Sequence, residues 1–217
     1  MKIDWEKIIK QKRLENIKQV YKSLDAKWLK EKITSESNRT GVPIEKFYEE
    51  IRDLNLSTII KFAKDPNKQN IHEIIASEFI KPIDGVTNFK ILPKSGKNAI
   101  YLTSDGNVLK YQPDFKSLKT IDMTWEYKNI TFYASHKYTY DEGGAQDNQF
   151  EDVKRFLESV QKIINPNVFF VCLTDGLYYQ KLVKNGMSRK DYLNMAYKGL
   201  SSAAISTEEL ADFMKKL

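Results

Sequence analysis

The chain has 217 residues, of which 41% are hydrophobic, so it can bury a full core. Its formal net charge of +6 suits a polyanionic partner such as a nucleic acid. No apolar run approaches the roughly 20 residues of a membrane-spanning helix, and the first residues are too charged for a signal peptide. The single cysteine, Cys172, excludes an internal disulfide, and with only two histidines no zinc-type spacing arises. We therefore expect a cytoplasmic protein that does not enter a membrane.

The first part of the sequence predicts lysine-rich amphipathic helices. Over residues 4–34 apolar side chains recur at helical spacing, namely Trp5, Ile8, Ile9, Ile17, Val20, Leu24, Trp28 and Leu29. The lysines between them are typical of a solvated helix face, and contact with a DNA backbone or dimerisation is the alternative. A further helix, expected over residues 71–80, carries Glu73 and Glu78. We expect a helical N-terminal region over residues 1–85 and an α/β core over residues 86–217, together forming one compact domain.

A basic loop with the sequence KILPKSGK occupies residues 90–97, in front of a predicted strand over residues 99–103. Lysines and accessible backbone amides in such a loop are suited to gripping phosphates. Lys94, Ser95 and Lys97 are therefore candidate DNA contacts.

Two β-branched and aromatic segments, residues 120–126 and 130–138, predict a hairpin with Lys128-Asn129 as its turn. If those two residues form the loop, Tyr127 faces Ile130 and Asp122 lies directly across from Ser135. Alternation then gives one polar face, made of Thr120, Asp122, Thr124, Glu126, Thr131, Tyr133, Ser135, Lys137 and Thr139. The opposite face is apolar and interrupted only by His136; it comprises Ile121, Met123, Trp125, Ile130, Phe132, Ala134 and Tyr138. We expect the apolar face to enter the core and the polar face to look into a cleft.

Asp122 and Lys137 on that face have the chemistry that phosphodiester hydrolysis needs. A bound cation neutralises the phosphate and lowers the pKa of an attacking water, and Mg²⁺ is usually held by one or two carboxylates plus water and phosphate. Asp122 can anchor the metal, while Lys137 can position the water or stabilise the developing charge. The alternative is an ordinary cross-strand ion pair.

The segment after the hairpin predicts a helix over residues 145–164, with Gln146 and Gln149 on its apolar side. Amides in that position need polar partners. A strand buried on both faces is expected over residues 168–173, and Asp175-Gly176 ends it. A helix over residues 188–198, an edge strand over residues 203–205 and a final helix opened by a Ser206–Glu209 capping box complete the chain.

The order of these motifs resembles that of type II restriction endonucleases of the PD-(D/E)XK nuclease superfamily. The shared features are a strand pair with a D…SxK pattern, then GGAQDNQ, a helix, a hydrophobic strand and DGLYY, and they span about residues 90–217. The resemblance implies an α/β fold with a central mixed sheet flanked by helices, and Mg²⁺-dependent cleavage of double-stranded DNA by water attack. It also implies a homodimer with one active site per strand, and a cognate DNA methyltransferase as a genetic partner.

The family's glutamate two residues before the lysine is Ser135 in this sequence. This departure is similar to that of the CCGG-core restriction enzymes, which supply the missing carboxylate from the next helix, at an offset that lands here on Glu151. The resemblance then implies Asp122, Ser135, Lys137 and Glu151 as the catalytic set, with Asp122 and Glu151 as metal ligands.

Helical phase disputes the role of Glu151, because on an ideal helix it points nearly opposite the apolar side. Gln146 and Gln149 point inward and are possible metal or phosphate contacts. Glu73 and Glu78 are further candidates, because members of the family often add a glutamate from an upstream helix.

A rival interpretation takes the family motif literally, as Pro113-Asp114 followed by Glu126-Tyr127-Lys128. Glu126 and Lys128 flank the predicted turn, however, where an active-site lysine is held less firmly than in mid-strand. Two other functions also remain open: a structure-specific or repair nuclease of the same superfamily, and a DNA-binding protein without catalytic activity.

Overall fold

The computed structural model describes residues 2–110, 119–140, 144–183 and 186–217. The chain divides into two compact units, Ile3–Ile71 and His72–Leu217, the latter taking in the first residues of the chain. The division falls ahead of the boundary at residue 85 that the sequence suggests. None of the helices in the described part of the chain combines the length and the apolar character needed to cross a bilayer.

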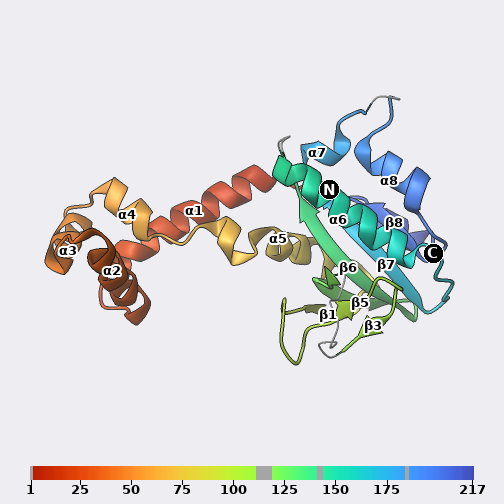
Figure 1. Ribbon diagram of the computed structural model, residues 1–217, viewed down its shortest axis with the longest axis horizontal. Coiled ribbons are helices and arrows are strands. Elements are labelled where there is room, and N and C mark those ends of the chain that lie inside the picture. Colours follow the sequence, from red (N-terminus) through yellow and green to blue (C-terminus); the bar gives the residue numbers. More distant parts are fainter. Residues whose placement is uncertain (1, 111–118, 141–143, 184–185) are drawn as a thin grey trace. The chain divides into compact units, whose positions relative to one another are not determined.

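The first unit is helical. It contains α1 (Trp5–Lys22), α2 (Lys27–Thr40), α3 (Ile44–Arg52), α4 (Leu56–Phe62) and the 3₁₀ turn η1 (Pro66–Gln69) (Figure 1). The carboxylate of Asp4 caps α1 by accepting a hydrogen bond from the Lys7 N–H. Its own core is formed by Val20, Leu29, Ile33, Phe47, Ile51, Ile59 and Phe62. The predicted helical character of residues 4–34 is confirmed, with a break between α1 and α2.

The second unit is built on a mixed sheet in the order β1 (Thr87–Ile91), β5 (Met123–Tyr127), β6 (Ile130–Tyr138), β7 (Val168–Asp175), β8 (Ser202–Ile205). The β6–β7 and β7–β8 pairs are parallel, and the other pairs are antiparallel. A small antiparallel sheet has the order β3 (Val108–Leu109), β2 (Tyr101–Leu102), β4 (Lys119–Thr120). The helices are α5 (Ile71–Ile80), α6 (Gly144–Val160), α7 (Leu177–Gln180), α8 (Arg189–Tyr197) and α9 (Leu210–Lys215). The expected α/β class with a central mixed sheet flanked by helices is confirmed.

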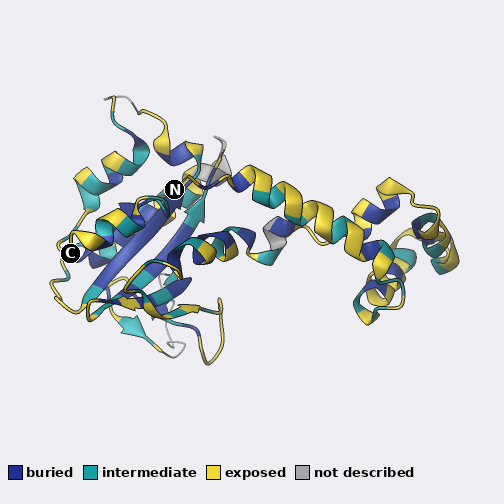
Figure 2. Cartoon of the chain, turned by 180° about the vertical axis from the view of Figure 1, so that it is seen from behind, coloured by how far each residue is buried: buried dark blue, intermediate teal, exposed yellow. Residues whose placement is uncertain are grey.

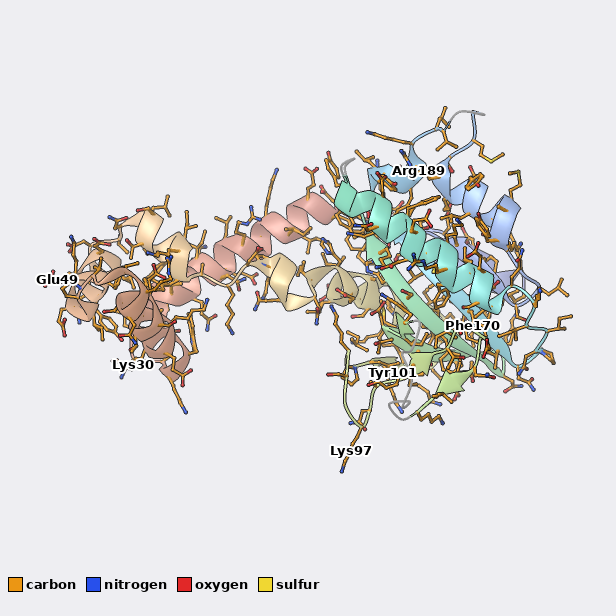
Figure 3. All side chains as sticks on the ribbon, viewed as in Figure 1. Lys30, Glu49, Lys97, Tyr101, Phe170 and Arg189 are labelled. Carbon is orange, nitrogen blue, oxygen red and sulfur yellow. The ribbon has the colours of Figure 1, made fainter. Side chains whose placement is uncertain are left out.

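The two faces of the large sheet are covered by different helices. On one face, apolar residues of α6, including Phe156 and Leu157, pack with Phe170 and Cys172 of β7; Phe170 is labelled next to α6 in Figure 3. On the other face, Phe213 of α9 lies 5.2 Å from Phe169, measured between ring centroids. Figure 2 shows the resulting burial of the central strands.

The hairpin has the predicted register, with Tyr127 opposite Ile130 and Met123 opposite Ala134. Lys128 and Asn129 both have positive φ, 46° and 64°, as a two-residue type I′ turn requires. This turn matches the twist of the strands and fixes which residues meet across them.

The prediction of a single strand over residues 120–126 is wrong, because these residues belong to two different sheets. Thr120 pairs with Tyr101 in the small sheet, whereas Met123 begins β5 in the large one. The Ile121 N–H donates to the Ile100 carbonyl over 2.8 Å, and the side chain of Ile121 packs in the α6 core. Because the chain crosses between sheets here, strict alternation fails, and Asp122 lies at the crossing.

Helix ends also differ from the sequence expectations. The helix predicted to reach residue 164 ends at Val160, and Ile164 is exposed. Ser206 and Glu209 make one of the two contacts of a capping box, in which the Ser206 N–H donates to Glu209 Oε2 over 3.1 Å. They occupy a turn, however, and α9 begins only at Leu210. The helix predicted over residues 188–198 is present as α8, and Ser188 is its N-cap.

Gly176, directly after β7, lies very close to the backbone at the end of β6. Its φ of 95° and ψ of 166° fall in a region that is essentially restricted to glycine. A Cβ there would lie 2.2 Å from the Thr139 carbonyl oxygen. We therefore expect Gly176→Ala to destabilise the protein by about 3 kcal/mol or more, measured by urea unfolding of the full chain.

Gly96 provides the control, because it also has a positive φ, 89°, but a Cβ there would meet nothing within 4 Å. Gly96→Ala should cost only the backbone strain, about 1–2 kcal/mol. Equal losses for the two variants would contradict the close approach at Gly176.

Candidate active site

Asp122 is anchored through both its backbone and its side chain. Its N–H donates to the Ala134 carbonyl over 2.9 Å, and its carbonyl accepts from the Leu92 N–H over 2.9 Å. Its Oδ2 accepts hydrogen bonds from Ser135 Oγ at 3.2 Å and from the His136 N–H at 2.8 Å. The predicted meeting of Asp122 and Ser135 is confirmed. Both of these hydrogen bonds fall on Oδ2.

A cavity of about 570 Å³ opens beside this carboxylate. Its wall draws on α5, the loop after β1, β4, β6 and α6, with Asp122 between the two sheets. The lining residues in the described part of the chain are His72, Glu73, Lys94, Lys119, Thr120, Asp122, His136, Lys137, Tyr138 and Gln149. The cavity thus brings together five of the predicted candidates: Glu73, Lys94, Asp122, Lys137 and Gln149.

Lysines outnumber carboxylates among the described residues that line this cavity. Lys94, Lys119 and Lys137 face Glu73 and Asp122. Lys94 Nζ lies 3.7 Å from Glu73 Oε1. A concave wall with an excess of positive charge concentrates anions, so phosphate is a fitting ligand.

Lys137 is held from α6 by Asp152, whose Oδ2 lies 2.7 Å from Lys137 Nζ. Burial opposes ionisation of Asp152, but the hydrogen bond and charge of Lys137 outweigh it and lower the pKa of this carboxyl. The lysine side chain is 14% exposed. Asp152 therefore orients the ammonium group at the edge of the cavity, a contact that sequence reasoning missed.

Lys119 is a second residue that sequence reasoning missed. Strict alternation along one strand places it on the face opposite Asp122, but the crossing between the sheets brings both to the same cavity. Burial lowers the pKa of Lys119, with a smaller contribution from the charge of Lys137, while Asp122 opposes the shift. The sequence pattern carries no signal for this placement.

The two histidines of the cavity have distinct surroundings. The side chain of His136 is 1% exposed, and its Nε2 lies 3.0 Å from Asp175 Oδ2. Asp175 also accepts hydrogen bonds from the N–H and the Oγ1 of Thr207. The histidine that interrupts the apolar face is therefore paired within the core.

His72 stacks on Tyr138 with 4.3 Å between ring centroids. Burial, assisted by the charge of His136, lowers the pKa of His72 to about 4. At neutral pH this ring is an uncharged, stacked part of the cavity wall.

Three acidic side chains were candidates for the second carboxylate, and only one of them lines the cavity. Glu151 lies 3.5 Å from Lys154 on α6, is 49% exposed and is not part of the cavity wall. Helical phase was thus the better guide to its position. Glu78 is exposed on α5 and also lies outside the wall, whereas Glu73, on the same helix, is part of it.

The remaining predicted residues divide between the cavity and other locations. Gln149 Oε1 accepts a hydrogen bond from Thr139 Oγ1 over 2.9 Å, which gives this inward amide its polar partner. The side chain of Gln146 and the whole of Asp114 lie outside the described residues. Ser95 and Lys97 are exposed and do not line this cavity.

The described residues of the rival motif, Glu126, Tyr127 and Lys128, do not line this cavity. Glu126 accepts a hydrogen bond from Asn88 Nδ2 over 2.7 Å. Lys128 lies at the hairpin tip, with its Nζ 5.4 Å from the centre of the Tyr127 ring.

The donor set suits a hard divalent cation in a partly hydrated site. Across the described residues, no group of three or more His, Cys, Asp or Glu side chains is arranged to hold a metal. Two carboxylates, Asp122 and Glu73, do line one cavity. Mg²⁺ commonly relies on one or two carboxylates and takes its other ligands from water and phosphate, so the two residue types are compatible with it.

No model of a known protein family matches the sequence, and a comparison with curated proteins finds no match.

Proposed function

We propose that this protein is a Mg²⁺-dependent endonuclease that hydrolyses double-stranded DNA in the manner of type II restriction enzymes. The supporting observation is the cavity in which Asp122, Lys137 and Glu73, from different elements, are gathered with two further lysines. This set combines carboxylates for a hard cation with positive charges for a phosphate. The motif order of the sequence and the mixed sheet between helices are compatible with this class.

Each residue has a separate role in the proposed reaction. Asp122 and Glu73 would hold Mg²⁺, which supplies charge neutralisation and a more acidic water. Ser135 and the His136 N–H fix the Asp122 carboxylate through the two bonds to Oδ2. Lys137, oriented by Asp152, stabilises the negative charge that develops on the phosphate as water attacks. Lys94 and Lys119 bind the phosphate groups beside it.

Restriction enzymes act on palindromic sites, so this proposal includes a homodimer with one active site per strand. It also includes a cognate methyltransferase that protects the host DNA. A repair or structure-specific nuclease would use the same site, and a panel of duplex, nicked and branched substrates separates the two.

Digestion of a fully sequenced phage DNA tests the proposal directly. We expect discrete fragments in the presence of Mg²⁺ and none after chelation with EDTA, because the carboxylates alone cannot activate water. Mapping the fragment ends then gives the recognition site. Cleavage that persists in EDTA would contradict metal dependence, and intact DNA in Mg²⁺ would contradict the proposed activity.

Three glutamates give a further test, because only Glu73 lines the cavity. Glu73→Gln should slow cleavage about 10–100-fold and raise the Mg²⁺ concentration needed. Glu151→Gln and Glu78→Gln are matched controls that should cleave normally. The Mg²⁺ dependence of the cleavage rate is the measurement. A dead Glu151→Gln variant beside an active Glu73→Gln variant would overturn this assignment.

A DNA-binding protein without hydrolytic activity is the second candidate. It is favoured by Ser135 in place of a carboxylate and by the described residues lacking a three-ligand metal group. On this alternative the chain binds DNA with the same affinity with or without Mg²⁺ and never cuts it.

A further inference from the structure

The polar face of the β5–β6 hairpin is shared between two cavities. Asp122 and Lys137 line the cavity already described. Further along the same strands, Thr124, Glu126, Thr131 and Tyr133 line a second cavity of about 900 Å³. The polar face therefore borders a second cavity as well as the first. The residues of this second cavity have no role in the hydrolysis step proposed above.

Exposed lysines dominate the charge of the second cavity. Lys90 on β1, Lys97 in the basic loop and Lys110 after β3 all line it, and all three are exposed. Figure 3 shows Lys97 extending away from the ribbon. Among the described lining residues only Glu126 carries a negative charge, and Asn88 hydrogen-bonds it. The wall is therefore complementary to a polyanion.

The two cavities share one loop as well as one strand pair. Lys94, in the loop after β1, lines the first cavity, whereas Lys97 in the same loop lines the second. A DNA backbone that is bound by Lys94 can therefore continue along the loop to Lys97.

Strand geometry gives the distance between the two compartments. Thr124 and Glu126 follow Asp122 by two and four residues, which corresponds to about 7 and 13 Å along an extended strand. Phosphates on one strand of DNA advance about 3.4 Å along the helix axis per base step. The second cavity therefore lies about two to four base steps from a phosphate at Asp122.

We infer that the second cavity holds the DNA strand two to four base steps from the phosphate to be cleaved, with Lys90, Lys97 and Lys110 on its phosphates. This inference rests on the proposed function, because DNA is taken as the substrate. Lysines on an edge strand also prevent edge-to-edge association, and that alternative predicts no contribution to DNA binding.

The test measures binding rather than cleavage, so that it does not depend on turnover. The full chain carrying Asp122→Asn is titrated with a short fluorescein-labelled duplex, without Mg²⁺, at several KCl concentrations. The same chain with Lys90→Ala, Lys97→Ala and Lys110→Ala added is compared with it. The logarithm of the DNA association constant falls linearly with log [KCl]. Loss of three phosphate contacts should reduce the magnitude of this slope by about 2 to 3.

A matched control removes three exposed lysines that line neither cavity, Lys162, Lys198 and Lys216. Its salt slope should stay at the reference value, and circular dichroism verifies the fold of both triple variants. Equal slopes for the two triple variants, or no DNA binding by the reference chain, would overturn the inference. If the wild-type chain cuts no DNA but the slopes differ as expected, the proposed hydrolysis is contradicted. The inference that the second cavity binds DNA would still hold.

Discussion

Asp122→Asn is expected to reduce DNA cleavage by about three orders of magnitude while leaving DNA binding equal or tighter. On the proposed mechanism, the substitution removes the charge that would anchor the cation and that would also repel the substrate phosphate. The fold should persist, because the amide oxygen of asparagine can still accept the hydrogen bonds from Ser135 and the His136 N–H. Cleavage rate and duplex affinity, measured on the same preparation, separate the two effects.

Asp105→Asn is the matched control, because it makes the same chemical change at an exposed turn and should cleave like the wild type. Substantial turnover by the Asp122→Asn variant would instead move the metal-anchoring role to another acid, with Asp114 of the literal motif as the first to test.

Lys137→Ala should lower the cleavage rate about 100-fold or more, because in the proposed reaction it removes the donor that would stabilise the developing charge. Its partner Asp152 is 48% exposed and can be solvated once the lysine is gone, so the loss of stability should be small. Lys128→Ala removes the same side chain at the hairpin tip and should leave the rate within about twofold.

Single-turnover cleavage of a mapped site is the measurement for this pair. The reverse ranking of the two lysines would support Glu126-Tyr127-Lys128 as the working motif and would separate the active site from the cavity around Asp122.

Local rules were sufficient where a few neighbouring residues determine the geometry. The two-residue turn and the alternation of residues 130–138 predicted the hairpin register and, with it, the contact between Asp122 and Ser135. The helix over residues 71–80 was predicted at its observed bounds because its apolar periodicity is short and regular.

The rest of the site depends on contacts between elements far apart in the chain. Lys119 reaches the cavity only because the backbone crosses between sheets at Ile121 and Asp122, and no residue pattern marks such a crossing. Likewise the contact between Asp152 and Lys137 depends on how α6 sits on the sheet. Helical phase indicated only that Glu151 points away from the apolar side of α6.

The type I′ turn at Lys128 and Asn129 fixes the pairing register of the hairpin. It thereby fixes the relative positions of Asp122 and Lys137. A one-residue insertion or deletion between them would slip the register and transfer one partner to the opposite face of the sheet. Natural variants of this protein should therefore keep the number of residues from Asp122 to Lys137 constant while the side chains between them change. Length changes should instead accumulate outside the hairpin, where no pairing register has to be preserved.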